Sequence, residues 1–477
     1  MTTPAPGPSD PHAAASSDPH AGEPLAPSRT AHPEPEPPAV TPRTDRIIGL
    51  DLARFIALAG MTATHVWLSA GLGTDEVIWG SSLFEGRASA LFAVLAGAGT
   101  VLATRAPLRD GRRAAARLML LGRGTAVIVI GLTLTALVDP PILVILVYYG
   151  MLFWMLALVI TWPRWALVVS ALVVAVGAPI ASVAVADAFG VTGREAANPS
   201  WTAFADPLEL ARGILFTGSY PSLIWLAYGL TGVLVGRALL RAVGSDTAGG
   251  VGAGTSSRSR EGAAQPTALR MLGVRLVAIG AAIWLAGIAA AALVQGPLGG
   301  VPAVARDLGV SDAEALELLQ VGGGSRPASG SPWLLAAVGP HSGTTLDLAV
   351  TAGFALTVIG LCVLLGTVLG PLARRILRPV TAAGAAPLTV YTAHVLLVGI
   401  VVEAALGRPY STLTYQEYIA LDTPWYLSSG GFYLANLLLA LAIGAALAAL
   451  RKRGPLETLV TWTGRRGAAL ARRSSRE

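Results

Sequence analysis

Charge is scarce in this 477-residue chain. Only 13% of its residues are Asp, Glu, Lys or Arg, whereas 53% are hydrophobic. Charged residues make up about a quarter of a typical soluble domain, so the composition excludes an ordinary soluble enzyme. Apolar runs of about 20 residues recur along the chain, each long enough to cross a hydrocarbon core of about 30 Å as a helix. We therefore expect an all-α, polytopic integral membrane protein in the cell membrane.

Cysteine and the common catalytic motifs are also lacking. The single cysteine, Cys362, has no partner for an intramolecular disulfide and excludes a Cys-based zinc cluster. The sequence contains no P-loop, no HExxH and no GxSxG motif. We therefore expect no metal site, and no nucleic-acid partner is expected either.

Ten apolar stretches have the length of a membrane span. They cover residues 47–69, 84–104, 115–137, 142–161, 164–186, 220–240, 270–294, 346–369, 380–403 and 431–450. With a cytoplasmic N-terminus, the cytoplasmic segments hold far more basic residues than the external ones, as the positive-inside rule requires. Both termini are therefore predicted to be cytoplasmic.

The segments outside these spans divide the chain into regions. The predicted regions are a disordered Pro/Ala-rich tail at 1–44, a six-helix half at 45–241, a flexible Gly/Ser linker at 242–268, a four-helix half at 269–450 and a basic cytoplasmic tail at 451–477. The external loop 295–345 contains Ser311 and Glu314 at the spacing of a capping box, which predicts a short helix. The basic tail is expected to meet anionic lipid headgroups.

Three ionisable residues interrupt the first apolar run. A charged group at the centre of a bilayer costs roughly 2.5 to 3.5 kcal/mol. This apolar run contains Asp51, Arg54 and His65, so these side chains need partners or a cavity. Arg54 and His65 are eleven positions apart, which places them on nearly the same helical face. They form either one polar stripe leading to a site or, for Asp51 and Arg54, a local ion pair at the inner interface.

Histidine is the second polar signal. Outside the N-terminal tail the chain has only His65, His341 and His394, and all three are predicted in the outer half of the membrane. Histidine is the commonest general acid or base near neutral pH, although each can equally be a hydrogen-bonded packing residue. Tyr391 shares a helical face with His394 and is a candidate donor.

Other polar residues suggest a binding site on each side of the membrane. Arg123 lies inside a predicted helix, where its planar guanidinium either binds a phosphate or snorkels to the cytoplasmic surface. Glu85 and Arg87 are expected as a pair at the outer mouth of the second helix. The stretch FTGSYPSLIWLAYG (216–229) interrupts an apolar segment, so its backbone must line protein or a cavity rather than lipid. An outer substrate cavity is predicted from Glu85, Arg87, Tyr220, His341 and Ser342.

Six stretches, in this order along residues 46–450, resemble a known family. They are GLDLARFIALAGM (49–61), EGRASALFAVLAGAG (85–99), ILVYYGMLF (145–153), YPSLIWLAYGLTGVLVGR (220–237), PHSGTTLDL (340–348) and AAGAAPLTVYTAHVL (382–396). Together they resemble the bacterial relatives of heparan-α-glucosaminide N-acetyltransferase, a family of polytopic transmembrane acyltransferases. The resemblance implies transfer of an acetyl group from cytoplasmic acetyl-CoA to an amino sugar on the other face.

The resemblance also assigns roles to residues. The family's Asp-x-x-Arg-Gly opening falls on Asp51, Arg54 and Phe55, so the Gly is absent, and an Asn of the family falls on His65. The family's catalytic His lies in the next loop, where this chain has Asp75 and Glu76.

On this resemblance His65 or His394 supplies the base, and Tyr391, Tyr220 or Ser342 supplies a hydrogen-bond donor. Arg54 and Arg123 hold the phosphates of an acyl-CoA that is a co-substrate rather than a bound cofactor, and Asp51, the neighbour of Arg54, belongs to the same donor site. The acceptor is a glycan or a small molecule. Two alternatives remain from the residues alone: a multi-pass transporter and a catalytically silent scaffold.

Overall fold

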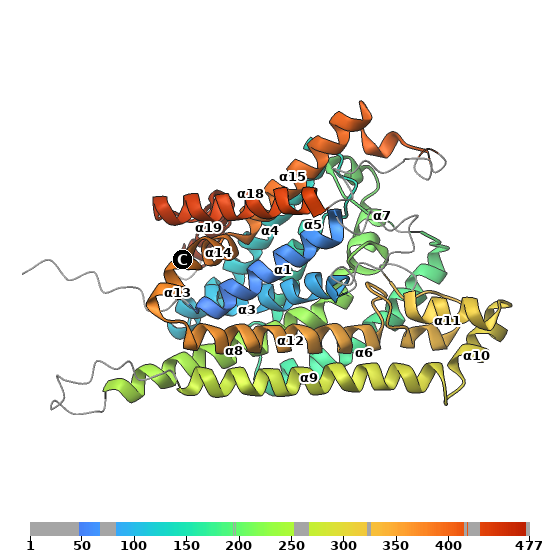
Figure 1. Ribbon diagram of the computed structural model, residues 1–477, viewed down its shortest axis with the longest axis horizontal. Helices are drawn as coiled ribbons and strands as arrows, with labels where there is room; N and C mark the ends of the chain where they lie inside the picture. The colour runs from blue at the N-terminus through green and yellow to red at the C-terminus, as the bar shows by residue number, and fades with distance from the viewer. Residues whose placement is uncertain are drawn as a thin grey trace, which may run out of the picture. The chain divides into compact units, whose positions relative to one another are not determined.

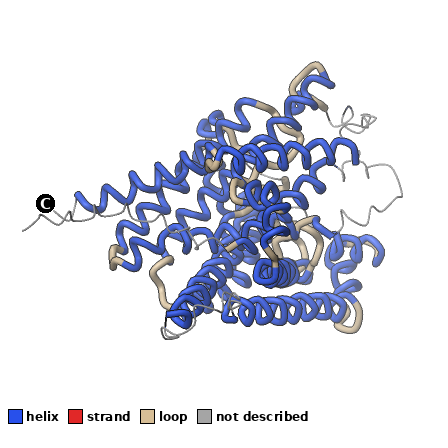
Figure 2. Tube along the Cα trace, turned by 60° about the vertical axis from the view of Figure 1, so that its left-hand side comes forward, coloured by secondary structure: helices blue, strands red, loops and turns tan. Residues whose placement is uncertain are grey.

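The computed structural model describes residues 47–66, 83–193, 195, 197–251, 267–321, 326–414, 417 and 430–473. Within these residues the regular secondary structure is entirely helical, and Figure 2 shows helices joined by loops with no strand in the described part. The predicted all-α class is therefore confirmed. The predicted disordered tail at 1–44 lies outside the described residues.

Eight of the described helices are long and apolar enough to cross a membrane. They are α3 (Arg87–Arg109), α4 (Arg113–Leu137), α6 (Arg164–Phe189), α8 (Ser222–Val251), α9 (Thr267–Gln295), α12 (Thr345–Val368), α15 (Pro387–Leu406) and α18 (Gly430–Leu450). Two further predicted spans fall on α1 (Ile48–Val66) and on α5 (Leu146–Val159), which has only 14 residues. A multi-pass protein is thus confirmed. The count of ten crossings and the cytoplasmic termini stay predictions.

Shorter helices lie between and after these spans. They are η2 (Trp201–Ala205), α7 (Pro207–Arg212), the π-helical turn η3 (Gly213–Thr217), α10 (Gly300–Leu308), α11 (Asp312–Val321), η4 (Pro332–Ala336), α13 (Pro371–Ile376), α14 (Arg378–Gly384), η5 (Tyr410–Thr412) and α19 (Pro455–Arg473). The capping box before α11 is confirmed, since Ser311 N donates to Glu314 Oε2 at 2.9 Å and Glu314 N donates to Ser311 Oγ at 3.3 Å. Residues 252–266 of the predicted linker lie outside the described residues.

Small residues let the central helices approach closely. In Figure 1, α3, α8, α9 and α12 run side by side. A Cβ added to Gly97 of α3 would meet the carbonyl oxygen of Gly229 in α8, and one added to Gly232 would meet that of Val94. Glycines at helix crossings allow such backbone contact, which is a common way to pack helices in a membrane.

The interruption before α8 is also confirmed. The π-helical turn Gly213–Thr217 ends in a bend, and the α-helix begins only at Ser222. Ser219 N donates to Tyr148 Oη at 3.2 Å, and Ser219 Oγ donates to the Ala197 carbonyl at 3.1 Å. The freed amide of Ser219 is therefore paired inside the protein, as a non-helical backbone in an apolar segment requires.

Candidate functional site

Two histidines that are distant in the sequence meet in the helix bundle. His65 Nδ1 lies 3.0 Å from His394 Nε2, and the rings stack with centroids 5.3 Å apart and planes inclined by 7°. His65 is near the end of α1, and His394 is buried in α15. On its other side, His394 Nδ1 lies 2.9 Å from Asn436 Oδ1 in α18. Three helices thus form a chain of side chains from Asn436 through His394 to His65.

The hydrogen-bond partners determine where the protons of this chain lie. Asn436 Nδ2 donates to the Phe432 carbonyl at 2.9 Å, so the amide oxygen Oδ1 is the atom that faces His394. An amide oxygen only accepts, so His394 Nδ1 must carry a proton, and Nε2 of the neutral ring must then accept. His65 Nδ1 therefore donates to His394, and His65 Nε2 is the basic nitrogen of the neutral ring.

The third histidine approaches this pair from the loop before α12. His341 is an electrostatic neighbour of His65, and its ring packs edge-on against Tyr220 with centroids 5.7 Å apart. Its φ of 59° lies in the left-handed region, which non-glycine residues seldom occupy and which often marks a constrained site. The structure thus brings together the three histidines that were predicted to converge.

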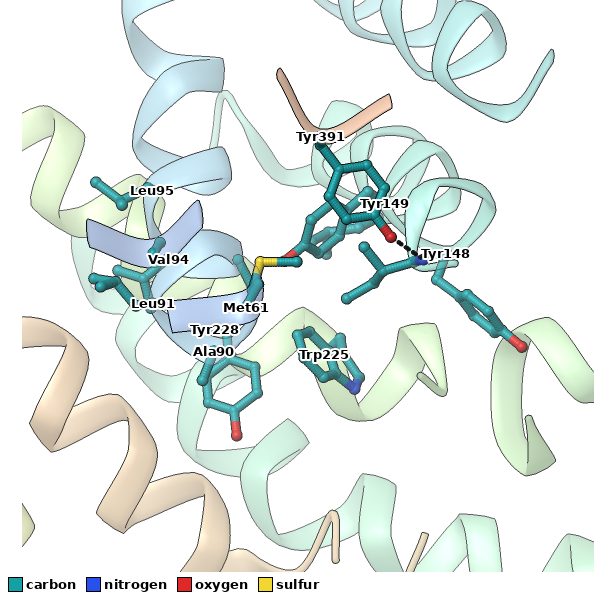
Figure 3. Close-up of a cluster of buried hydrophobic side chains, with 14 of the residues drawn as sticks. Met61, Ala90, Leu91, Val94, Leu95, Tyr148, Tyr149, Trp225, Tyr228 and Tyr391 are labelled. Atoms are coloured by element: carbon teal, nitrogen blue, oxygen red, sulfur yellow. Dashed lines mark hydrogen bonds between the residues drawn. The ribbon is translucent and has the colours of Figure 1, made fainter. Parts of the chain in front are cut away.

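Tyr391 does not join the histidine chain. Its Oη accepts a hydrogen bond from Ile145 N at 3.4 Å, and Figure 3 shows the ring beside Tyr149 in a buried cluster that includes Met61 and Trp225. Tyr391 is 3% exposed. In this position it holds α15 against the residues that precede α5, and its proposed role as a donor to substrate is not tested by this contact.

A small pocket adjoins His341 at the same end of the bundle. It is lined by Gly86, Ser219, Ile224, Trp225, Tyr228, His341, Gly343 and Asp347. Asp347 is buried in the first turn of α12, and Ser342 is fully buried beside it. Of the predicted cavity residues, His341 lines this pocket directly, while Tyr220 packs against both His341 and Trp225.

Glu85 and Arg87 lie next to this pocket. Arg87 Nη1 donates to the Leu83 carbonyl at 3.2 Å, and its charge interacts with both Glu85 and Asp347. Partial burial raises the pKa of Glu85, and the Arg87 guanidinium acts in the opposite direction. The Arg87 guanidinium is therefore an electrostatic neighbour of two carboxylates, Glu85 and Asp347, and the direct pairing of Glu85 with Arg87 stays a prediction.

The residues predicted to hold a donor lie elsewhere. Arg54 Nη1 donates to Asp51 Oδ1 at 2.8 Å, so the local ion pair is present within α1. Arg123 of α4 lies under α19, where Gly464 leaves room for its side chain. Its charged neighbours are Glu457 and Arg453. The structure shows no contact that brings Arg54 and Arg123 together among the described residues.

Glu457 links α19 to the helix that carries His394. Its Oε1 accepts from Leu388 N at 2.7 Å and Thr389 N at 3.1 Å, and its Oε2 accepts from Thr389 Oγ1 at 2.6 Å. A carboxylate at a helix N-terminus pairs with free N–H groups and with the helix dipole. The basic C-terminal segment is therefore docked on the bundle, and its predicted contact with anionic lipid stays a prediction.

Two residues of the site were missed in the sequence analysis. Asn436 stands in the apolar run YLANLLL and Asp347 in PHSGTTLDL. The signal was available for Asn436, because a lone amide in a membrane span needs a hydrogen-bond partner. Asp347 was hidden by its position at the predicted helix start, where an acidic residue is ordinary capping chemistry.

Comparison with known proteins gives one match. No curated protein and no solved structure matches the chain. Residues 46–250 match the family model described as heparan-alpha-glucosaminide N-acetyltransferase, catalytic. This range contains His65, Arg87 and Arg123, whereas His341 and His394 lie beyond it; Asp75 and Glu76 fall inside it but outside the described residues. Over residues 46–250, the chain is therefore similar to the catalytic domain of the heparan-α-glucosaminide N-acetyltransferase family.

Proposed function

We propose that the protein transfers an acetyl or other acyl group from a cytoplasmic acyl-CoA to an external or envelope acceptor such as an amino sugar. The observation that supports this most is the chain from Asn436 through His394 to His65, because it presents a basic nitrogen at the end of α1. The match of residues 46–250 to an acetyltransferase catalytic domain supports the same class of reaction.

His65 is the proposed general base. The acceptor nitrogen attacks the thioester carbonyl carbon, the C–N bond forms and the C–S bond breaks. His65 Nε2 takes the proton that the amine loses and returns it to the departing CoA thiolate. His394 and Asn436 hold the His65 ring in the required tautomer, so they are positioning residues.

The donor is proposed to approach from the opposite end of the bundle. Arg123 lies in the cytoplasmic part of α4 under the predicted topology, and a guanidinium suits the phosphates of CoA. Arg54, already paired with Asp51, is a second candidate for phosphate contact. The acyl-CoA is a co-substrate that leaves after transfer.

A transporter is not favoured. Buried charge and an interrupted helix are compatible with transport, but the matched family is a catalytic domain. The hydrogen-bonded set of His65, His394 and Asn436 suits the base of an acyltransferase, although His relays also occur in proton-coupled carriers. The acyltransferase accounts for both observations.

Donor binding tests this proposal. Arg123→Ala is expected to weaken acetyl-CoA binding to the purified protein roughly 10- to 100-fold, the effect of losing a charge-assisted contact with a phosphate. The matched control is Arg117→Ala, also in α4, whose exposed guanidinium donates to Thr161 Oγ1 at 3.0 Å. Titration calorimetry measures both. Equal affinities for wild type and Arg123→Ala would remove Arg123 from the donor site, and folded wild type that binds no acetyl-CoA would contradict the acyltransferase.

A further inference from the structure

The pocket beside His341 contains a buried carboxylate. Asp347 is 3% exposed and lines the pocket together with His341 and Gly343. Its Oδ2 accepts a hydrogen bond from Gly343 N at 3.0 Å, and the Ser342 side chain and the Arg87 guanidinium are further polar neighbours of the carboxylate. A buried carboxylate that lines a cavity needs a donor or a cation to offset its desolvation.

Among the described residues, two carboxylates and one guanidinium interact beside the pocket. The charge of Arg87 interacts with two carboxylates, those of Asp347 and Glu85. With both carboxylates ionised and His341 neutral, these described groups carry an excess of one negative charge. A cationic group in the pocket would restore neutrality, whereas a neutral hydroxyl would not.

The walls of the pocket also suit a cation. Trp225 and Tyr228 line it and pack edge to face with centroids 5.2 Å apart. Tyr228 Oη shares a 2.7 Å hydrogen bond with Thr351 Oγ1, so the ring is fixed. Aromatic rings attract ammonium groups through their π-electrons, and the attraction is stronger in a desolvated site.

The size of the pocket limits what can enter. Its free volume is about 10 Å³, and a single water molecule needs roughly 10–15 Å³ on the same measure. An ammonium group is close to water in size. The pocket therefore lies at the lower limit of the space that one ammonium group needs, and the remainder of the ligand must lie outside it.

We propose that Asp347 is the specificity-determining residue that binds the ammonium group of the acceptor, between Trp225, Tyr228 and His341. This inference rests on the proposed function, because it gives the position at which the amine of the acceptor binds. Asp347 selects amines over the corresponding alcohols and brings the nitrogen next to His341, an electrostatic neighbour of the base His65. Because an ammonium nitrogen has no lone pair, it first gives one proton to the Asp347 carboxylate, which later releases this proton to solvent; the neutral amine then attacks the thioester, and its second proton goes to His65.

The test is binding of glucosamine and of glucose, which differ by one ammonium group, to the donor-free protein at a pH at which the amine is protonated. Wild type is expected to bind glucosamine at least about 10-fold more tightly than glucose, the effect of one charge-assisted hydrogen bond. Asp347→Asn is expected to abolish this preference. The substituted amide can still accept from Gly343 N, so the start of α12 keeps its hydrogen bond.

The matched control is Glu314→Gln, which removes a carboxylate from the capping box of α11, outside the pocket. It is expected to keep the wild-type preference. Equal binding of the two sugars by wild type, no binding of glucosamine, or a preference that survives in Asp347→Asn would each overturn the proposal. Acetyl-CoA titrations on the same samples separate the two hypotheses. Wild type that prefers glucosamine but binds no acetyl-CoA would refute the acyltransferase. Wild type that binds acetyl-CoA but shows no preference for glucosamine would refute only the role of Asp347.

Discussion

Replacement of His65 by alanine is expected to lower acyl transfer by about 100- to 10,000-fold, the range that a positioned general base contributes. His65 donates from Nδ1 to His394, so the reactive lone pair resides on Nε2. Alanine removes this nitrogen without affecting the distant residues proposed to hold the donor. The measurement is the initial rate of transfer from radiolabelled acetyl-CoA to glucosamine.

The control for His65→Ala is Arg408→Gln, which breaks an exposed ion pair with Glu417 and should keep wild-type activity. Acetyl-CoA affinity and thermal unfolding are measured on both variants, so that a loss of activity is not mistaken for a loss of fold. A fully active His65→Ala variant would remove His65 from the mechanism.

Gly97→Ala is expected to destabilise the bundle by at least about 1–3 kcal/mol, the usual cost of overpacking a close-packed interior. The new methyl group would meet the carbonyl oxygen of Gly229, and its next neighbours, the C and Cα atoms of Gly229, also belong to the backbone. No side chain can rotate away, so α3 and α8 must separate. The expected result is a lower midpoint of thermal unfolding in the same detergent.

Gly99→Ala is the matched control in the same helix. A Cβ at Gly99 meets no atom within 4 Å, and alanine has a higher helix propensity than glycine. Gly99→Ala should therefore be as stable as wild type or slightly more stable. Equal midpoints for the two variants would show that the contact between α3 and α8 does not limit stability.

The helices could be predicted from the sequence because their signal is local. Each span needs a run of apolar residues, and α3, α4 and α12 lie close to the predicted ranges. The Asp51–Arg54 pair follows from a spacing of three on one helix. The interruption before Ser222 follows from a Gly-Ser-Tyr-Pro sequence that cannot continue a helix.

The partners within the site could not be predicted in the same way. His65 and His394 are 329 positions apart, and no periodicity links α1 to α15. The docking of α19 depends on where Gly464 meets α4 and where Glu457 meets α15. Such contacts arise from the packing of whole helices, so the sequence indicated three histidines at one level without showing which two form the pair.

Transfer across a bilayer tests the central claim most directly. Wild-type protein in liposomes, with acetyl-CoA added on the side of the C-terminal segment and glucosamine on the other, should produce N-acetylglucosamine only in the glucosamine compartment. The His65→Ala protein should produce almost none. Movement of glucosamine across the bilayer without acetylation would contradict the acyltransferase and establish a transporter instead.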